Sequence, residues 1–114
     1  MLHTLQHLSV LDLAPGYRAR LVHADSMTLS YVDVDAGAPL PEHAHVHEQI
    51  TTLLEGRFEM VVGGVSMVLE AGQTVIIPSQ VPHSGKALTA CRILDVFHPV
   101  REDLKNKTVA YGHR

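Results

Sequence analysis

The sequence predicts an all-β fold, a closed barrel or a sandwich, in a single domain that ends in a short helix. Short segments rich in Val, Ile, Leu, Thr and Tyr recur between turn residues, which is the spacing of barrels and sandwiches. Apolar and polar residues alternate within several of these segments, as in strands with one buried face. The length of 114 residues corresponds to about one domain.

Seven segments are predicted to be strands. In chain order they are Tyr17–His23, Met27–Asp35, Ile50–Leu54, Phe58–Val62, Val65–Glu70, Thr74–Ile77 and Arg92–His98. The alternation is clearest on either side of Gly63-Gly64, which predicts a two-residue hairpin because glycine reaches positive φ at little cost. After Pro99, Arg101–Lys107 is the segment with the character of a short helix.

Composition and charge exclude several classes of protein. The net charge is −3 and the nine Lys and Arg residues are scattered, so the basic patch of a nucleic-acid-binding protein is missing. Cys91 is the only cysteine, so an intrachain disulfide is impossible. Residues 1–10 lack the pattern of a signal peptide, and no apolar run approaches the roughly 18 residues of a membrane span. We therefore expect a cytoplasmic protein that binds neither nucleic acid nor membrane.

The unusual feature of the composition is its nine histidines, of which His43, His45 and His47 fall within five positions. On one extended strand, His43 and His45 would project from the same face, and Gln49 has the same parity. His83 would join them if a neighbouring strand of the barrel lies alongside. A single histidine is usually a hydrogen-bonded or exposed side chain, and Gln49 could instead hydrogen-bond to a ligating histidine. As a group, these residues predict a metal site.

The last predicted strand contains a second candidate for chemistry. Asp95 shares a strand face with Phe97, and a carboxylate among apolar neighbours is costly to bury unless it is paired. Asp95 could transfer protons, because desolvation raises a carboxyl pKa toward neutrality, or it could form a structural ion pair with Arg101 or Arg18. Arg101, just beyond this strand, could bind a substrate carboxylate or could be an exposed residue at the start of a helix.

The spacing of these residues resembles the two sequence motifs of the cupin family. The first motif is matched by Gly37, five residues, His43, one residue, His45, three residues, Gln49, six residues and Gly56. The second is matched by Gly72, five residues, Pro78 and then His83. Gln49 stands where many cupins have Glu, Gln80 where the second motif has Gly, and Ala87 where it often has Asn. The resemblance implies that residues 1–114 form one cupin domain, a double-stranded β-helix or jelly-roll barrel, with its metal motifs within residues 37–87.

Three stretches resemble a narrower group, the pectin-degradation cupins called KdgF. They are HAHVHEQITTLLEGRFEM from His43, VPHS around His83 and LDVFHPVRED from Leu94. Members of that family convert 4,5-unsaturated monouronates, released from pectin or alginate, into the linear 5-keto-4-deoxyuronate. The resemblance implies metal ligation by His43, His45, Gln49 and His83, and catalysis by Asp95, Phe97 and Arg101. The pattern of residues agrees except at Phe97, which by itself would be assigned to the core.

The predicted cofactor is one divalent metal ion. Three neutral imidazoles and a neutral amide oxygen leave such an ion with its full positive charge, so the site should attract an anion. These ligands suit Mn, Fe, Co, Ni or Zn alike. Two other functions remain open at this point: another metal-dependent cupin enzyme such as an iron dioxygenase, and a protein that binds a sugar acid or small anion without turnover. We expect a homodimer, because edge strands and apolar segments such as Leu8–Leu13 could pair with a second copy.

Overall fold

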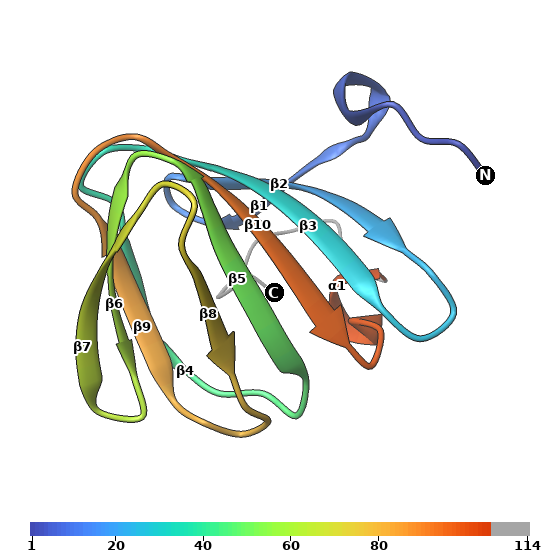
Figure 1. The fold of residues 1–114 in the computed structure, drawn as a ribbon. Helices are drawn as coiled ribbons and strands as arrows, with labels where there is room; N and C mark the ends of the chain where they lie inside the picture. The colour runs from blue at the N-terminus through green and yellow to red at the C-terminus, as the bar shows by residue number, and fades with distance from the viewer. Residues whose placement is uncertain (106–114) are drawn as a thin grey trace.

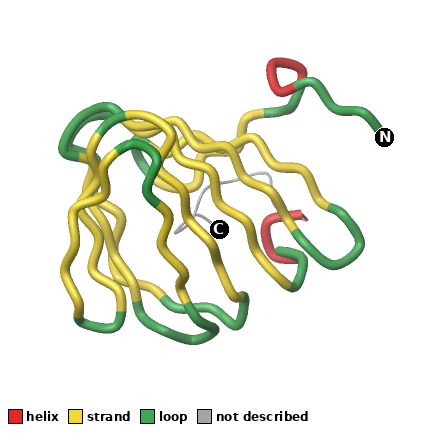
Figure 2. Tube along the Cα trace, viewed as in Figure 1, coloured by secondary structure: helices red, strands yellow, loops and turns green. Residues whose placement is uncertain are grey.

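Ten strands form two antiparallel sheets that lie face to face in the computed structural model, which describes residues 1–105 (Figure 1). The strands are β1 (Val10–Ala14), β2 (Tyr17–His23), β3 (Thr28–Val34), β4 (Pro39–His43), β5 (Glu48–Glu55), β6 (Arg57–Val62), β7 (Val65–Glu70), β8 (Thr74–Ile77), β9 (His83–Ala87) and β10 (Cys91–His98). A six-stranded sheet has the order β1-β2-β3-β10-β5-β8, and a four-stranded sheet has the order β4-β9-β6-β7. Figure 2 shows that strands dominate the chain, so the all-β prediction is confirmed.

Two short helices flank the sheets. The 3-10 helix η1 (Leu5–His7) precedes β1, and the helix α1 (Glu102–Lys105) follows β10. The predicted helix after Pro99 is therefore present and begins one residue later than expected, while residues 106 and 107 of that prediction lie outside the described residues. Within residues 1–105, no helix has the length and apolar character needed to cross a membrane.

All seven predicted strands are present, and β2, β7 and β8 have the predicted bounds. The hairpin prediction is also confirmed, because Val62 pairs with Val65 and both intervening glycines have positive φ. Three strands were missed: β1, β4 and β9. β4 contains Pro39 and Pro41, and β9 has the sequence HSGKA, so neither shows the apolar alternation used to recognise a strand.

The segment Leu8–Leu13, expected to be able to pair with a second copy, includes the edge strand β1 of the six-stranded sheet, so this pairing stays a prediction. Residues from Val10 onward form β1, which pairs with β2 of the same chain, and Leu11 is buried. Leu13 also packs against the core, whereas Val10 is 48% exposed.

The space between the sheets changes in character along the strands. At one end the inward-facing residues of the six-stranded sheet are apolar, as in the cross-strand row formed by Ala19, Val32, Ile93 and Leu53. The next two rows toward the other end are mostly polar, and they include Ser30, Asp95, Thr51, Thr28 and Gln49. Buried polar side chains need partners, so this end of the sandwich is where a functional site is expected.

The four-stranded sheet closes over this polar end by a close contact at Gly85. A Cβ atom at Gly85 would lie 2.4 Å from the Phe58 ring, so only glycine lets β9 approach that ring. This contact fixes β9 two residues after His83, which points between the sheets and is buried.

Candidate metal centre

Three histidines from two strands and a connection meet at the polar end of the sandwich. His43 ends β4 and pairs directly with His83, which begins β9, while His45 lies in the connection from β4 to β5. One ligand atom from each imidazole lies within 4.8 Å of the others, so the three could hold a metal ion. The expectation that His43 and His45 share one extended strand was wrong. They converge because the chain crosses from one sheet to the other between them.

All three imidazoles hydrogen-bond to the backbone through the same ring nitrogen, Nδ1. Nδ1 of His43, His45 and His83 lies 2.9, 3.0 and 2.9 Å from the carbonyl oxygens of Pro41, His47 and Val81, respectively. A carbonyl oxygen can only accept, so each Nδ1 carries the hydrogen and each neutral ring keeps its lone pair on Nε2. This is the arrangement found in most metal-ligating histidines.

Burial keeps two of these imidazoles neutral. Desolvation, assisted by the charge of Arg101, lowers the pKa of His45 to about 4, and desolvation likewise lowers the pKa of His83. His83 Nε2 is buried and has no hydrogen-bond partner among the described residues. An unpartnered buried nitrogen is costly, and a metal ion would satisfy it.

Gln49, which was predicted to be the fourth ligand, is buried on β5 beside this group. Its Nε2 donates to Thr51 Oγ1 at 2.8 Å and to Asp95 Oδ1 at 3.2 Å, which turns Oε1 toward His45 Nε2 at 3.1 Å. Both of the facing atoms are acceptors when His45 is neutral. The reversed amide would turn its oxygen toward the Asp95 carboxylate instead. A cation bound by both acceptors removes this conflict, so the donor set fits a divalent metal.

Asp95 lies on β10 behind Gln49 and faces the same space. Its Oδ1 accepts hydrogen bonds from Thr51 Oγ1 at 2.6 Å and from Gln49 Nε2. Desolvation raises the pKa of the Asp95 carboxyl to about 6, although these hydrogen bonds and the charge of Arg101 act in the opposite direction. Arg18, one of the partners considered for Asp95, pairs with Asp35 instead. The pKa of Asp95 is thus close to neutral pH, where a carboxyl group can both donate and accept a proton.

Arg101 is only 2% exposed, so of the two alternatives considered for it, the exposed arginine at the helix start was wrong. Its Nε and Nη2 donate to the two carboxylate oxygens of Asp103 at 3.0 and 2.8 Å, and its backbone N–H donates to Thr28. The guanidinium carbon lies 4.6 Å from the centre of the Phe97 ring. Burial alone would raise the pKa of Asp103, but the hydrogen bonds and charge of Arg101 lower it to about 2. Arg101 and Asp103 therefore form an ion pair at neutral pH.

Phe97 links the arginine to the histidines. Its ring is buried and meets the His45 ring edge-on, with 5.8 Å between the ring centres. His47 lies outside the three-histidine group, with its ring 5.4 Å from that of His45, and His98 is exposed at the end of β10. Thr51 and Asp103 were missed by the sequence analysis. Thr51 lies two residues after Gln49 and therefore on the same face of the strand, which is the one sequence signal that could have identified it.

Two cavities meet at these residues. An inner cavity of about 50 Å³ is lined by the three histidines together with Gln49, Asp95 and Phe97. A wider cavity of about 390 Å³ lies between the β1–β2 turn, β4 and the helix start, and shares His43, His45 and Arg101 with the inner one. A small anionic molecule in the wider cavity would therefore contact His43, His45 and Arg101 together.

The sequence matches the family model for the cupin domain over residues 30–97, more than half of the chain. The chain belongs to the cupin family. No protein with curated annotation matches this cupin in sequence.

Several solved structures superimpose on most of this chain. An RmlC-like cupin from Shewanella frigidimarina superimposes with a TM-score of 0.85 at 29% identity, covering 90% of this chain and 93% of the other. KdgF from Halomonas sp. superimposes with a TM-score of 0.83 at 27% identity, covering 89% of this chain and 94% of the other. Salicylate 1,2-dioxygenase from Pseudoaminobacter salicylatoxidans superimposes with a TM-score of 0.70 at 21% identity, covering 77% of this chain and 26% of the other. This similarity shows a shared fold.

Proposed function

We propose that this cupin, loaded with one divalent metal ion, converts 4,5-unsaturated monouronates into the linear 5-keto-4-deoxyuronate. The observation that carries the proposal is the Asp95 carboxyl group, with a pKa of about 6, which the Gln49 amide joins to His45, one of three clustered histidines. The similarity to KdgF from Halomonas sp. over nine-tenths of the chain supports the choice of substrate.

His43, His45, His83 and Gln49 would hold the metal. When bound, a divalent ion supplies positive charge that binds the uronate carboxylate and polarises it. Imidazole and amide ligands suit Ni, Mn, Fe, Co or Zn, and the ion present depends on supply as well as on the site.

Arg101 and Phe97 would position the sugar. The guanidinium group is fixed by Asp103 on one side and by the Phe97 ring below, so it offers its charge to a carboxylate in a defined place. The Phe97 ring lines the inner cavity together with the histidines and Arg101, and it would pack against the face of the sugar ring that enters from the wider cavity. Both contacts would align the substrate before proton transfer.

Asp95 would move the proton. Because Oδ1 accepts two hydrogen bonds from protein groups, the transferable proton belongs on Oδ2. Protonation of C4 of the enol ether by Asp95 leaves positive charge at C5, where water adds. The proton released by that water returns to the Asp95 carboxylate, and the resulting hemiketal opens to the ketone. General acid catalysis of this kind contributes roughly 100- to 10,000-fold in rate.

The decisive experiment follows the loss of the conjugated double bond of freshly prepared unsaturated galacturonate by its ultraviolet absorbance. Metal-analysed protein should accelerate this loss above the spontaneous rate, stripped protein should not, and re-loading should restore it. Asp95→Asn is the matched control, because the asparagine oxygen can accept the same bonds from Thr51 and Gln49 and so keep the metal site intact. Protein that holds one metal per chain and gives no acceleration would refute this substrate, and oxygen uptake with aromatic substrates would then be tested.

A further inference from the structure

The segment after β10 carries both members of one ion pair, Arg101 and Asp103, although it belongs to neither sheet. Its backbone hydrogen bonds are local, since the Glu102 N–H donates to the carbonyl oxygen of Val100 and two amides of α1 donate to that of Arg101. Such bonds shape the segment but do not fix its place on the body of the molecule. The place of the Arg101 guanidinium group in the cavity wall therefore depends on contacts with the strands.

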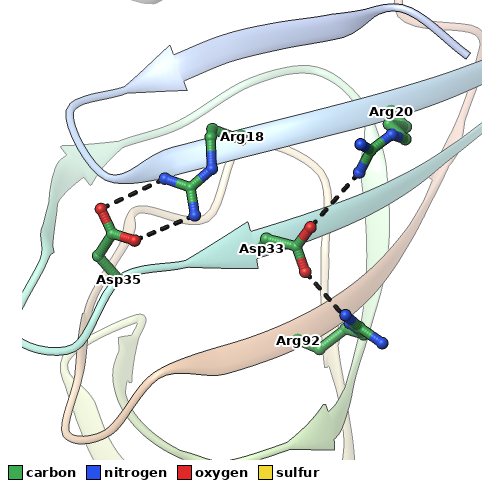
Figure 3. A network of polar contacts seen from close by, with 5 residues as sticks. All are labelled: Arg18, Arg20, Asp33, Asp35 and Arg92. Carbon is green, nitrogen blue, oxygen red and sulfur yellow. Dashed lines mark hydrogen bonds and ion pairs between the residues drawn. The ribbon is translucent and has the colours of Figure 1, made fainter. Parts of the chain in front are cut away.

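Arg101 differs from the arginines on the outer face of the six-stranded sheet. Figure 3 shows three of these, each paired with an acidic residue at the surface: Arg18 with Asp35, and Arg20 and Arg92 with Asp33. The side chains of Arg18 and Arg92 are 43% and 55% exposed, whereas that of Arg101 is 3% exposed. A buried guanidinium group cannot swing through solvent to compensate for a shift of its backbone. The attachment of that backbone therefore decides where the charge lies.

One cross-strand row attaches both the backbone and the side chain of Arg101. In this row Thr28 of β3 pairs with His23 of β2 on one side and with Phe97 of β10 on the other. The backbone N–H of Arg101 donates to Thr28 Oγ1 at 2.9 Å, and the guanidinium carbon lies 4.6 Å from the centre of the Phe97 ring. Thr28 is only 1% exposed, so solvent does not compete for its hydrogen bond.

His23 fixes the orientation of the Thr28 hydroxyl group. His23 Nδ1 lies 2.8 Å from Thr28 Oγ1. Because Oγ1 accepts the hydrogen bond from the Arg101 N–H, its own single hydrogen is available to Nδ1 of a neutral imidazole. Burial, with a smaller contribution from the charge of Lys105, lowers the pKa of His23 and so favours that neutral form. The hydroxyl group then donates to His23 and keeps a lone pair directed at the Arg101 backbone.

His23 and Thr28 lie outside the space that a substrate would occupy. Neither of them is among the described residues that line the inner or the wider cavity, whereas Arg101 lines both. Any effect of the Thr28 hydroxyl group on a bound molecule must therefore pass through the residue that it holds.

We propose that His23 and Thr28 are positioning residues for Arg101, and that their hydrogen bonds set the place at which the substrate carboxylate is bound. The inference rests on the proposed function, which identifies that carboxylate as part of a uronate. Recognition of a carboxylate by a guanidinium group depends on the relative placement of the two planar groups. A displaced Arg101 should therefore weaken carboxylate binding, while Asp95, which is held from β5, still transfers the proton.

The first test is Thr28→Val, which keeps the shape of the side chain but removes its hydrogen bonds. KM for unsaturated galacturonate should rise about two- to tenfold, as expected for the loss of a hydrogen bond, with little change in kcat. Thr28→Ser retains the hydroxyl group and should restore KM. Thr52→Val makes the same chemical change in a hydroxyl group that bonds to Thr74 on the outer face, so it should leave KM unaltered.

A second pair of variants tests the imidazole. His23→Phe removes the acceptor but keeps a ring, so it should raise KM as Thr28→Val does. His23→Asn can present an oxygen atom near the place of Nδ1 and should restore part of the affinity. Because His23 is only partly buried, these variants replace Thr28→Val if urea unfolding shows that it fails to fold.

Binding is measured separately from turnover, by calorimetry of the metal-loaded protein with saturated galacturonate, which has no double bond to react. The dissociation constant should rise in Thr28→Val by about the same factor as KM. If KM and the dissociation constant stay unchanged in this variant, the positioning role is overturned and the proposed reaction stands. Equal falls in kcat and kcat/KM that Thr28→Ser does not reverse would show a merely structural role and would also overturn it.

The opposite failure is distinguishable. Galacturonate binding that weakens in Thr28→Val, in a protein that does not turn over the unsaturated sugar, would support the positioning role and refute the proposed reaction. A wild type that binds no galacturonate would overturn the positioning role as well.

Discussion

Replacing Asp95 by asparagine should stabilise the metal-free protein at neutral pH while removing most of its activity. Burial raises the pKa of Asp95 from 3.8 to about 6, so the ionised form is disfavoured in the folded state. The difference of about two pKa units corresponds to about 3 kcal/mol of unfolding free energy at pH 7. Asparagine keeps the shape and the acceptor oxygen but never ionises, so it should gain an amount of this order.

The sign of the pH dependence makes the prediction specific. A raised folded-state pKa means that protonated Asp95 favours folding, fully below the unfolded pKa of about 4, and that this stabilisation is lost as pH rises through about 6. The advantage of Asp95→Asn should therefore be largest above pH 6 and disappear toward pH 4.

The assay is urea unfolding of the wild type and the variant across this pH range, after the metal has been removed with a chelator. Turnover of unsaturated galacturonate by the metal-loaded variant should fall roughly 100- to 10,000-fold. The reasoning would be refuted if the stability difference between variant and wild type did not vary with pH, or if it favoured the variant less at pH 7 than at pH 4. Either result would mean that burial does not destabilise the ionised Asp95 carboxylate.

Three further substitutions test neighbouring contacts. Thr51→Val removes the 2.6 Å hydrogen bond that favours ionised Asp95, so the pKa of this general acid should rise and the alkaline limb of the pH–activity profile should move up by about one to two pH units, whereas Thr52→Val on the outer face should not move it. Asp103→Asn loosens the hold on the buried guanidinium group, so KM for a carboxylate substrate should rise severalfold with little change in kcat; equal falls in kcat and kcat/KM would contradict a positioning role. Gly85→Ala places a methyl group against the Phe58 ring and should lower the unfolding free energy by about 1–3 kcal/mol, measured in urea; an unchanged value would show that the ring moves without cost.

Local patterns in the sequence predicted those parts of the fold in which each strand carries its own signal. β6 and β7 alternate apolar and polar residues around two glycines, so their existence and pairing could be read directly, with the bounds correct for β7 and one residue short for β6. β4 and β9 form because they cover the polar cavity, not because of their own propensity, so prolines and a glycine concealed them. A strand whose formation depends on tertiary packing has no local signature.

The candidate site likewise has some features that the sequence predicted and others that it did not. The histidines were found because ligand residues recur at a fixed spacing, and their convergence was expected although the strand geometry offered for it was wrong. The environment of Asp95 depends on the register of β10 against β5, which sets Asp95 opposite Thr51 across a long sequence separation. The burial of Arg101 likewise follows from packing on Phe97 and Thr28. Such contacts between distant residues cannot be deduced from one sequence.

The carbonyl groups that receive the three imidazole hydrogens have an implication for how this cavity can change in evolution. Each belongs to a residue two positions away along the backbone, so the aim of the three histidines does not depend on the identity of any surrounding side chain. Gln49 differs, because its amide is turned by the side chains of Thr51 and Asp95. Substitutions around the cavity can therefore alter the acid, the fourth ligand and the shape of the pocket while three nitrogen ligands stay aimed at one point. A scaffold with this property could change the chemistry of its cavity and still keep three nitrogen atoms able to hold a metal ion.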